Sequence, residues 1–160
     1  EKRTVYFAKD IHQMNLVMGK FLQKGGAQTV LLLDEAGHLI ARQGERSPAS
    51  EDTITALVAG TYAASRAMAE MLGTREFSSF IPRGGGGNLL LLRAGDRALL
   101  AVAFSDDTTA TLVRTYALEA VRRLAAILAT REARALVEEE EIEGERFDKE
   151  IDGALTDVFG

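Results

Sequence analysis

The chain contains no cysteine and no tryptophan, and it has only two prolines and two histidines. Without cysteine, a disulfide scaffold and a thiolate metal site are both excluded. No stretch approaches the roughly 18 consecutive apolar residues that a membrane-spanning helix needs. The first ten residues lack the apolar run of a secretion signal, so we expect a cytoplasmic protein. With 160 residues, of which 46% are hydrophobic, the chain is long enough to form one domain with a substantial core.

Positive charge is scarce near the C-terminus. Residues 138–160 hold ten acidic and two basic side chains, a net charge of −8, whereas residues 1–137 hold fourteen acidic and seventeen basic side chains, a net charge of +3. Nucleic acid and anionic lipid repel so acidic a segment, and a body at +3 is too weakly basic to indicate either partner. We therefore expect no binding of nucleic acid and no membrane insertion.

The acidic end also carries an apolar stripe. Apolar residues recur there at every fourth position, at Phe147, Ile151, Leu155 and Phe159. A helix would place these side chains on one face. We divide the chain into a domain over 1–137, an acidic linker over 138–145 and an amphipathic tail over 146–160. Two interpretations of the tail are open, because the stripe could dock on a partner protein or fold back on its own domain.

The remaining patterns predict three helices and five strands. The helices are expected at 9–24, at about 51–72, and from a cap at Asp107 into the acidic segment. Hairpins are expected within 27–45 and between Asn88–Arg93 and Ala98–Phe104, with a short edge strand, Glu76–Ile81, that Pro82 ends. Because hairpin-joined strands are antiparallel, we expect an α+β sandwich of the order α-β-β-α-β-β-β-α. Its antiparallel sheet is covered by helices, and a C-terminal tail helix follows.

The second predicted helix has one side that is almost bare of side chains. Small residues occupy that side, at Ala56, Ala59, Gly60, Ala63, Ala64 and Ala67. A glycine in the middle of a helix costs about 1 kcal/mol relative to alanine. The small face could pack closely on the protein's own sheet, or it could meet a twin helix or a partner protein. Both can hold, since a helix has two sides.

Groups for catalysis are sparse. The histidines, His12 and His38, fall on different predicted elements, and we interpret both as surface residues. The carboxylate pairs Asp34-Glu35 and Asp106-Asp107 stand where a turn or a helix cap uses an acid. Ser78 and Ser79 have no neighbouring base in the sequence. We therefore expect no catalytic residue, no metal site and no cofactor.

The run Gly84–Gly87 is not the loop of a nucleotide-binding site. A phosphate-binding loop follows a strand and opens a helix, with Lys and Ser or Thr after the last glycine. Here the sequence Asn88-Leu89-Leu90-Leu91 follows, and this is a predicted strand. We interpret the glycines as a flexible hairpin loop.

Four segments together resemble a known family. They read VLLLDEAGHLIARQGE, TITALVAGTYAASRAMAEMLG, EFSSFI and NLLLLRAGDRALLAVAFSDDTTATLVR. Over about residues 8–130 the chain resembles a Roadblock domain of the dynein light chain superfamily. The clearest matches are the hairpin with Asp34 and Gly37 and the helix segment from Leu57 to Gly60. Within the family it is most similar to the bacterial MglB group, which regulates the Ras-like GTPase MglA and also carries a C-terminal tail.

This resemblance implies a homodimer that activates GTP hydrolysis by a small Ras-like GTPase. It places the dimer interface at Ala56, Ala59, Phe77 and Phe80. It places the GTPase-binding residues on the second helix and the tail, at Gly60, Ala63, Ala64, Ala67, Phe147, Ile151, Leu155 and Phe159. The resemblance further implies that the tail helix affects nucleotide exchange, that the process is bacterial cell polarity or motility, and that the protein gathers at a cell pole.

Two alternatives accompany this interpretation. The chain could supply an arginine finger to the GTPase from Arg66 or Arg83, whereas the resemblance implies that the GTPase's own Arg and Gln are repositioned. It could instead be a dimeric Roadblock scaffold that does not touch hydrolysis.

Overall fold

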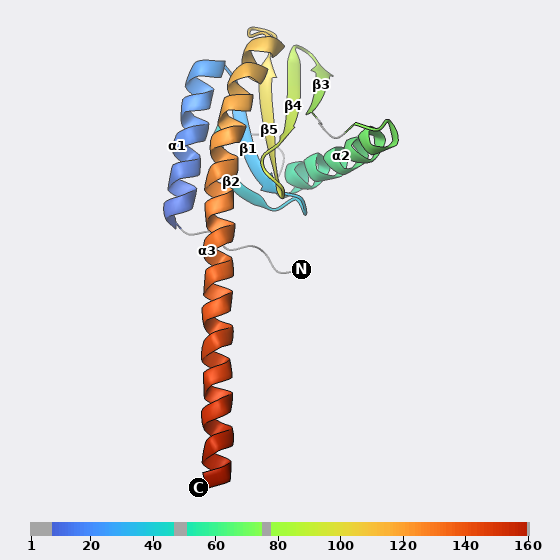
Figure 1. Ribbon diagram of the computed structural model, residues 1–160. Coiled ribbons are helices and arrows are strands. Elements are labelled where there is room, and N and C mark those ends of the chain that lie inside the picture. The colour runs from blue at the N-terminus through green and yellow to red at the C-terminus, as the bar shows by residue number, and fades with distance from the viewer. Residues whose placement is uncertain (1–7, 47–50, 75–77, 160) are drawn as a thin grey trace. The chain divides into compact units, whose positions relative to one another are not determined.

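The predicted order of helices and strands is confirmed by a computed structural model, which describes residues 8–46, 51–74 and 78–159 (Figure 1). The elements are α1 (Ala8–Gly25), β1 (Thr29–Asp34), β2 (Leu39–Gly44), α2 (Glu51–Met71), β3 (Ser78–Gly84), β4 (Gly87–Arg93), β5 (Ala98–Ser105) and α3 (Ala110–Phe159). The fold is an α+β sandwich with an antiparallel sheet, as predicted.

The five strands form one sheet in the order β2-β1-β5-β4-β3. Every neighbouring pair is antiparallel, including the long-range pair β1 and β5, in which Leu31 lies opposite Ala101. β3 is an edge strand, as predicted, but it does not end before Pro82. Pro82 lies opposite Asn88 within the strand, and the strand continues to Gly84. On one side, an edge strand has no neighbouring strand to form backbone hydrogen bonds with, so it tolerates a residue that lacks an N–H group.

Helices cover both faces of the sheet (Figure 1). On one face α1 and the first part of α3 form the larger core, in which Met14, Phe21 and Leu124 pack on the side chains of Leu32 and Leu100. On the other face α2 forms a smaller core with the alternate residues of the same strands. Because successive strand residues point to opposite faces, the run Val30 to Leu33 serves both cores.

The glycine run forms a hairpin, as predicted, but a tight one. Gly84 and Gly87 lie opposite each other at the ends of β3 and β4, and only Gly85 and Gly86 form the turn. Both turn residues have positive φ angles, 61° and 80°, which glycine adopts without steric cost. Asp106 holds the turn, because its backbone N–H donates to the Gly86 carbonyl oxygen at 2.9 Å.

α3 begins at Ala110, and its cap is Thr109 rather than the predicted Asp107. The Thr109 Oγ1 accepts a hydrogen bond from the backbone N–H of Leu112 at 3.2 Å, which satisfies a donor of the first helical turn. Asp107 lies outside the helix, where its carboxylate accepts a hydrogen bond from the Ser105 hydroxyl at 3.3 Å. Asp and Thr are both common capping residues, and Thr109 is the one that directly precedes the first helical residue.

The predicted tail helix is present as the C-terminal part of α3, and the segment proposed as an acidic linker, 138–145, is also helical. The chain divides into two compact units, one ending at Leu128 and the other beginning at Ala129, and each is described by itself. Among the described residues, no helix combines the length and the apolar character that a membrane crossing requires.

Candidate partner-binding surfaces

One side of α2 is fixed to the sheet. Thr55, Val58 and Tyr62 are buried, and the latter two join the smaller core. The start of the helix is held by an ion pair in which the Arg42 Nε lies 2.9 Å from Glu51 Oε1. A carboxylate in the first turn also interacts favourably with the helix dipole. The opposite side of α2 is thereby placed at the surface.

The small residues of α2 lie mainly on that outer side. Ala56, Gly60, Ala63, Ala64 and Ala67 are at least partly exposed, and Ala59 is half-buried. A Cβ placed on Gly60 would have no heavy atom of another element within 4 Å. Among the described residues, therefore, nothing in the domain explains why position 60 is a glycine.

The turn between β1 and β2 explains why some of the α2 positions hold small residues. Gly37, with φ of 91°, approaches α2 so closely that an added Cβ would lie 3.3 Å from the Ala56 Cα and 3.4 Å from the Ala59 Cβ. Larger side chains at positions 56 and 59 would push this turn away. The interpretation of packing on the protein's own sheet thus applies to Ala59, which also packs against the smaller core, whereas Ala56 meets the β1–β2 turn. It does not apply to Ala63, Ala64 and Ala67.

The outer side of α2 also carries large apolar side chains that we did not predict as a surface. Leu57 and Met68 are exposed, Met71 is 87% exposed, and Leu72, which directly follows the helix, is 81% exposed. A helix that is apolar on all sides is normally buried on all sides. In α2 only one side is covered, so the other side is a candidate surface for a second protein. Leu57, Ala64, Met68 and Met71 are seven, four and three positions apart, a spacing that places them on one side of a helix, and this is the sequence signal that could have revealed the surface.

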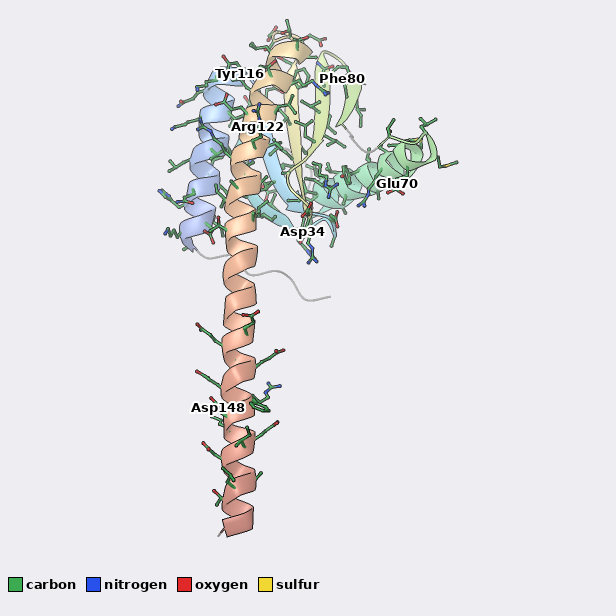
Figure 2. All side chains as sticks on the ribbon, in the orientation of Figure 1. Asp34, Glu70, Phe80, Tyr116, Arg122 and Asp148 are labelled. Atoms are coloured by element: carbon green, nitrogen blue, oxygen red, sulfur yellow. The ribbon has the colours of Figure 1, made fainter. Side chains whose placement is uncertain are left out.

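A groove runs along α2 beside the β1–β2 turn. It is lined by Glu35, Ala59, Tyr62, Ala63, Arg66, Ala67 and Glu70. The Arg66 guanidinium lies 3.5 Å from Glu35 Oε1 and 3.3 Å from Glu70 Oε1. Figure 2 shows Glu70 on the helix. Burial raises the pKa of the Tyr62 phenol, so this group is a neutral hydroxyl at physiological pH. The groove combines two expected GTPase-binding residues, Ala63 and Ala67, with a charged rim.

The edge strand β3 is a second exposed feature of the domain. Phe80 is 48% exposed, and its ring centroid lies 6.0 Å from that of Phe104 (Figure 2). Phe80 pairs with Leu90, a residue of the larger core, so it belongs to the sheet face opposite α2. The other predicted interface residue of this segment, Phe77, lies outside the described residues. The structure does not bring Phe80 together with Ala56 and Ala59 on one face.

The C-terminal part of α3 carries the predicted apolar stripe. Phe147, Ile151 and Leu155 are exposed to 42–62%. Their spacing places them on one face of the helix. Asp148 and Asp152 are exposed at adjacent positions (Figure 2 labels Asp148). The side chain of Phe159 lies outside the described part of the chain. This stripe is an exposed apolar surface with an acidic border.

The candidate catalytic groups have structural roles or lie apart. The Asp34 Oδ1 accepts hydrogen bonds from the backbone N–H of Ala36 at 3.0 Å and of His38 at 2.9 Å, which closes the turn. Its Oδ2 lies 3.0 Å from the His38 Nδ1. His12 is exposed on α1. Over the described residues, no group of three or more His, Asp or Glu side chains is arranged to hold a metal ion.

Comparison with known proteins places this domain in a family. The sequence profile of the Roadblock/LC7 domain matches residues 14–104, which is more than half of the chain. The chain belongs to the Roadblock/LC7 domain family. The match covers the domain from the middle of α1 to β5, including the whole of α2.

Solved structures similar to this Roadblock chain are those of MglB. The gliding protein MglB of Thermus thermophilus is 29% identical, with a TM-score of 0.72. MglB of Myxococcus xanthus is 27% identical, with a TM-score of 0.73. An MglB described as having a tetrameric arrangement is 28% identical, also with a TM-score of 0.73. Each comparison covers 79% of this chain and 96% of the other. No curated protein matches the chain by sequence.

Proposed function

We propose that the protein is an MglB-like regulator that activates GTP hydrolysis by a small, MglA-like GTPase in bacterial cell polarity or motility. The observation that carries this proposal is the outer side of α2, where Ala63, Ala67, Met68 and Met71 form an exposed surface on a helix whose other side is already buried. The likeness to MglB at 27–29% identity supports the choice of partner.

Activation without a catalytic group requires a change in the partner. GTP hydrolysis needs an oriented water molecule and neutralised transition-state charge, which together contribute about 10³–10⁵ in rate. A regulator can provide this by binding the GTPase conformation in which the GTPase's own Arg and Gln are in place. Small residues on α2 suit this role, because they allow another backbone to approach closely and make extended contact. The protein itself is then no enzyme.

We further propose that the working unit is a homodimer. Its interface would combine the α2 side bearing Ala56 and Ala59 with Phe77 and with the β3 edge bearing Phe80. An edge strand with one open side can extend a sheet into a second copy. The tetrameric arrangement described for one MglB supports self-association as a property of this type of chain. Each dimer would hold the GTPase asymmetrically, on α2, while a tail engages it at a separate place and affects nucleotide exchange.

The proposal is tested by measuring GTP turnover of the purified MglA-like GTPase from the same organism. We expect addition of this protein to raise turnover by at least about a hundredfold, a threshold below the roughly 10³–10⁵ that activation of a GTPase contributes. Binding to the GTP-bound form without any increase in turnover would assign the protein to the Roadblock scaffolds instead. Absence of binding to both nucleotide forms would refute the proposal.

Arginine substitutions distinguish repositioning from an arginine finger. We expect Arg66→Ala and Arg83→Ala each to leave stimulated turnover within about fivefold of the wild-type value, because the essential arginine belongs to the GTPase. In this structure Arg66 is already engaged by Glu35 and Glu70. A loss greater than about a hundredfold, with binding preserved in a pull-down at the same concentration, would establish a finger supplied in trans.

Removal of residues 146–160 tests the tail. Because Phe147, Ile151 and Leu155 are exposed, we expect the deletion to change Tm by no more than about 2 °C. We expect the affinity for the GTPase to fall by at least about tenfold, since an apolar helix face is a common docking element. The stripe variant Ile151→Asp should reproduce the loss, and Glu145→Gln should not. A fall in Tm of many degrees would favour the interpretation in which the tail packs on its own domain.

A further inference from the structure

A shallow cleft lies between α1 and α3, on the sheet face opposite α2. Its apolar centre is formed by Phe21, which is buried, and by Val17 and Tyr116, which are half-buried. Lys20, Lys24 and Arg123 are exposed and also line the cleft, together with Glu119 and Ala120. Figure 2 shows Tyr116 on α3 where this helix runs beside α1. The cleft is thus an apolar strip with basic side chains along it.

Basic residues are concentrated on this face of the domain. Over α1 and the part of α3 that ends at Leu128 there are six basic and two acidic side chains, a net charge of +4. One of the acidic residues, Asp10, is buried. The other, Glu119, also lines the cleft, and its Oε1 lies 3.2 Å from the Arg123 guanidinium. No ion pair with another described residue engages Lys20 or Lys24.

The tail carries the complementary pattern. Its stripe of Phe147, Ile151 and Leu155 is an apolar strip with acidic side chains along it, in a segment whose net charge over 138–160 is −8. At about 100° per residue, Asp148 and Asp152 follow the stripe on one side, and Glu143 and Glu150 follow it on the other. An apolar helix face of this kind fits a groove with apolar centre and oppositely charged edges.

We propose that the α1–α3 cleft of one copy binds the acidic tail of a second copy of this chain. Each copy then offers one cleft and one tail, so the contact is heterologous and can join copies head to tail. Anionic lipid would meet the same basic residues, but the segment 138–160, with its net charge of −8, belongs to the same chain as the cleft and carries its own apolar strip. This contact uses the sheet face opposite α2, and it requires no GTPase.

The first measurement is the molecular mass of the full-length protein alone, by sedimentation velocity from micromolar to millimolar concentration. We expect the mass to rise with concentration beyond that of the smallest species. Raising the salt from about 50 mM to about 500 mM should weaken this association by at least about tenfold, because exposed charges are screened beyond a few ångströms. A mass that is independent of concentration would overturn the proposal.

The second measurement exchanges the charges. The cleft variant Lys20→Glu/Lys24→Glu/Arg123→Glu and the tail variant Asp148→Lys/Glu150→Lys/Asp152→Lys should each lose the association, with the dissociation constant raised at least about tenfold. A mixture of the two variants should regain it, since each cleft then finds a tail of opposite charge on the other variant. The control Lys9→Glu/Arg114→Glu/Arg122→Glu removes the same charge outside the cleft and should stay within about threefold of wild type.

The mixture decides the question. Failure of the mixture to associate would overturn the proposal even if each variant had lost association. An equal loss in the control would show that only net charge matters, and would overturn it too. A third outcome would assign the cleft to lipid instead. In that outcome the wild-type protein does not self-associate but binds phosphatidylserine vesicles, and among the variants the cleft variant alone loses this vesicle binding. The cleft variant changes no residue that is proposed to bind the GTPase, so GTP turnover measured with that variant is a separate test of the proposed function.

Discussion

Ala63→Arg/Ala67→Arg is expected to reduce stimulated GTP turnover by at least about a hundredfold, toward the rate of the GTPase alone. Both alanines are exposed on α2 and line the groove beside the β1–β2 turn. Two arginine side chains would occupy the space in which the backbone of the GTPase is expected to approach α2. The fold should be retained, because arginine is nearly as good a helix former as alanine and neither position is buried. Turnover and Tm are measured on the same preparation.

A matched variant distinguishes the effect of blocking the α2 surface from the effect of adding two positive charges. Gln13→Arg/Thr111→Arg adds the same two arginines at exposed positions of α1 and α3, on the other side of the sheet. We expect it to retain turnover within about threefold of wild type, as exposed substitutions away from an interface usually do. Light scattering must show the same mass for both variants, which excludes dissociation of the proposed dimer. Full activity of the α2 variant at wild-type mass would remove the outer side of α2 from the GTPase-binding surface.

Much of the fold could be predicted because its signals are local. Apolar residues at 3–4 spacing marked α1, and two apolar runs around a glycine-containing turn marked each hairpin. The order of strands had no such signal. β1 pairs with β5, about seventy positions away, and only packing of both faces decides that pairing. The extent of β3 through Pro82 was missed for a related reason, since whether a proline is tolerated depends on which strand forms the edge of the sheet.

The candidate site was predicted in part. The small face of α2 was visible because alanine and glycine recur along one side. The large apolar residues beside it, Leu57, Met68 and Met71, interleave with the core residues Val58 and Tyr62, so the helix is apolar on nearly all sides and its periodicity is weak. The contact between Arg66 and Glu35 crosses 31 positions and depends on the β1–β2 turn reaching α2. Spacing in the sequence carries no information about such a contact.

Gly44→Ala is expected to cause the largest loss of stability, about 3 kcal/mol of unfolding free energy or roughly 10 °C in Tm. Gly44 ends β2 with a φ of 100°, and an added Cβ would lie only 2.2 Å from the backbone carbonyl oxygen of Gln28. That oxygen is itself held, because it accepts a hydrogen bond from the Glu45 N–H at 3.0 Å. The clash is therefore with the backbone, so relief requires β1 and β2 to separate where they pair.

Gly73→Ala isolates the part of this loss that comes from the backbone angle alone. Gly73 follows α2 with a φ of 76°, and an added Cβ there would have no heavy atom of the described residues within 4 Å. The cost is then that of a left-handed conformation for an L-residue, about 1 kcal/mol. Both variants are melted at one protein concentration, since self-association would shift Tm by mass action. If the two variants lost the same unfolding free energy, the close approach of the Gln28 carbonyl to Gly44 would contribute nothing to the loss. Position 44 would then require glycine for its φ angle only.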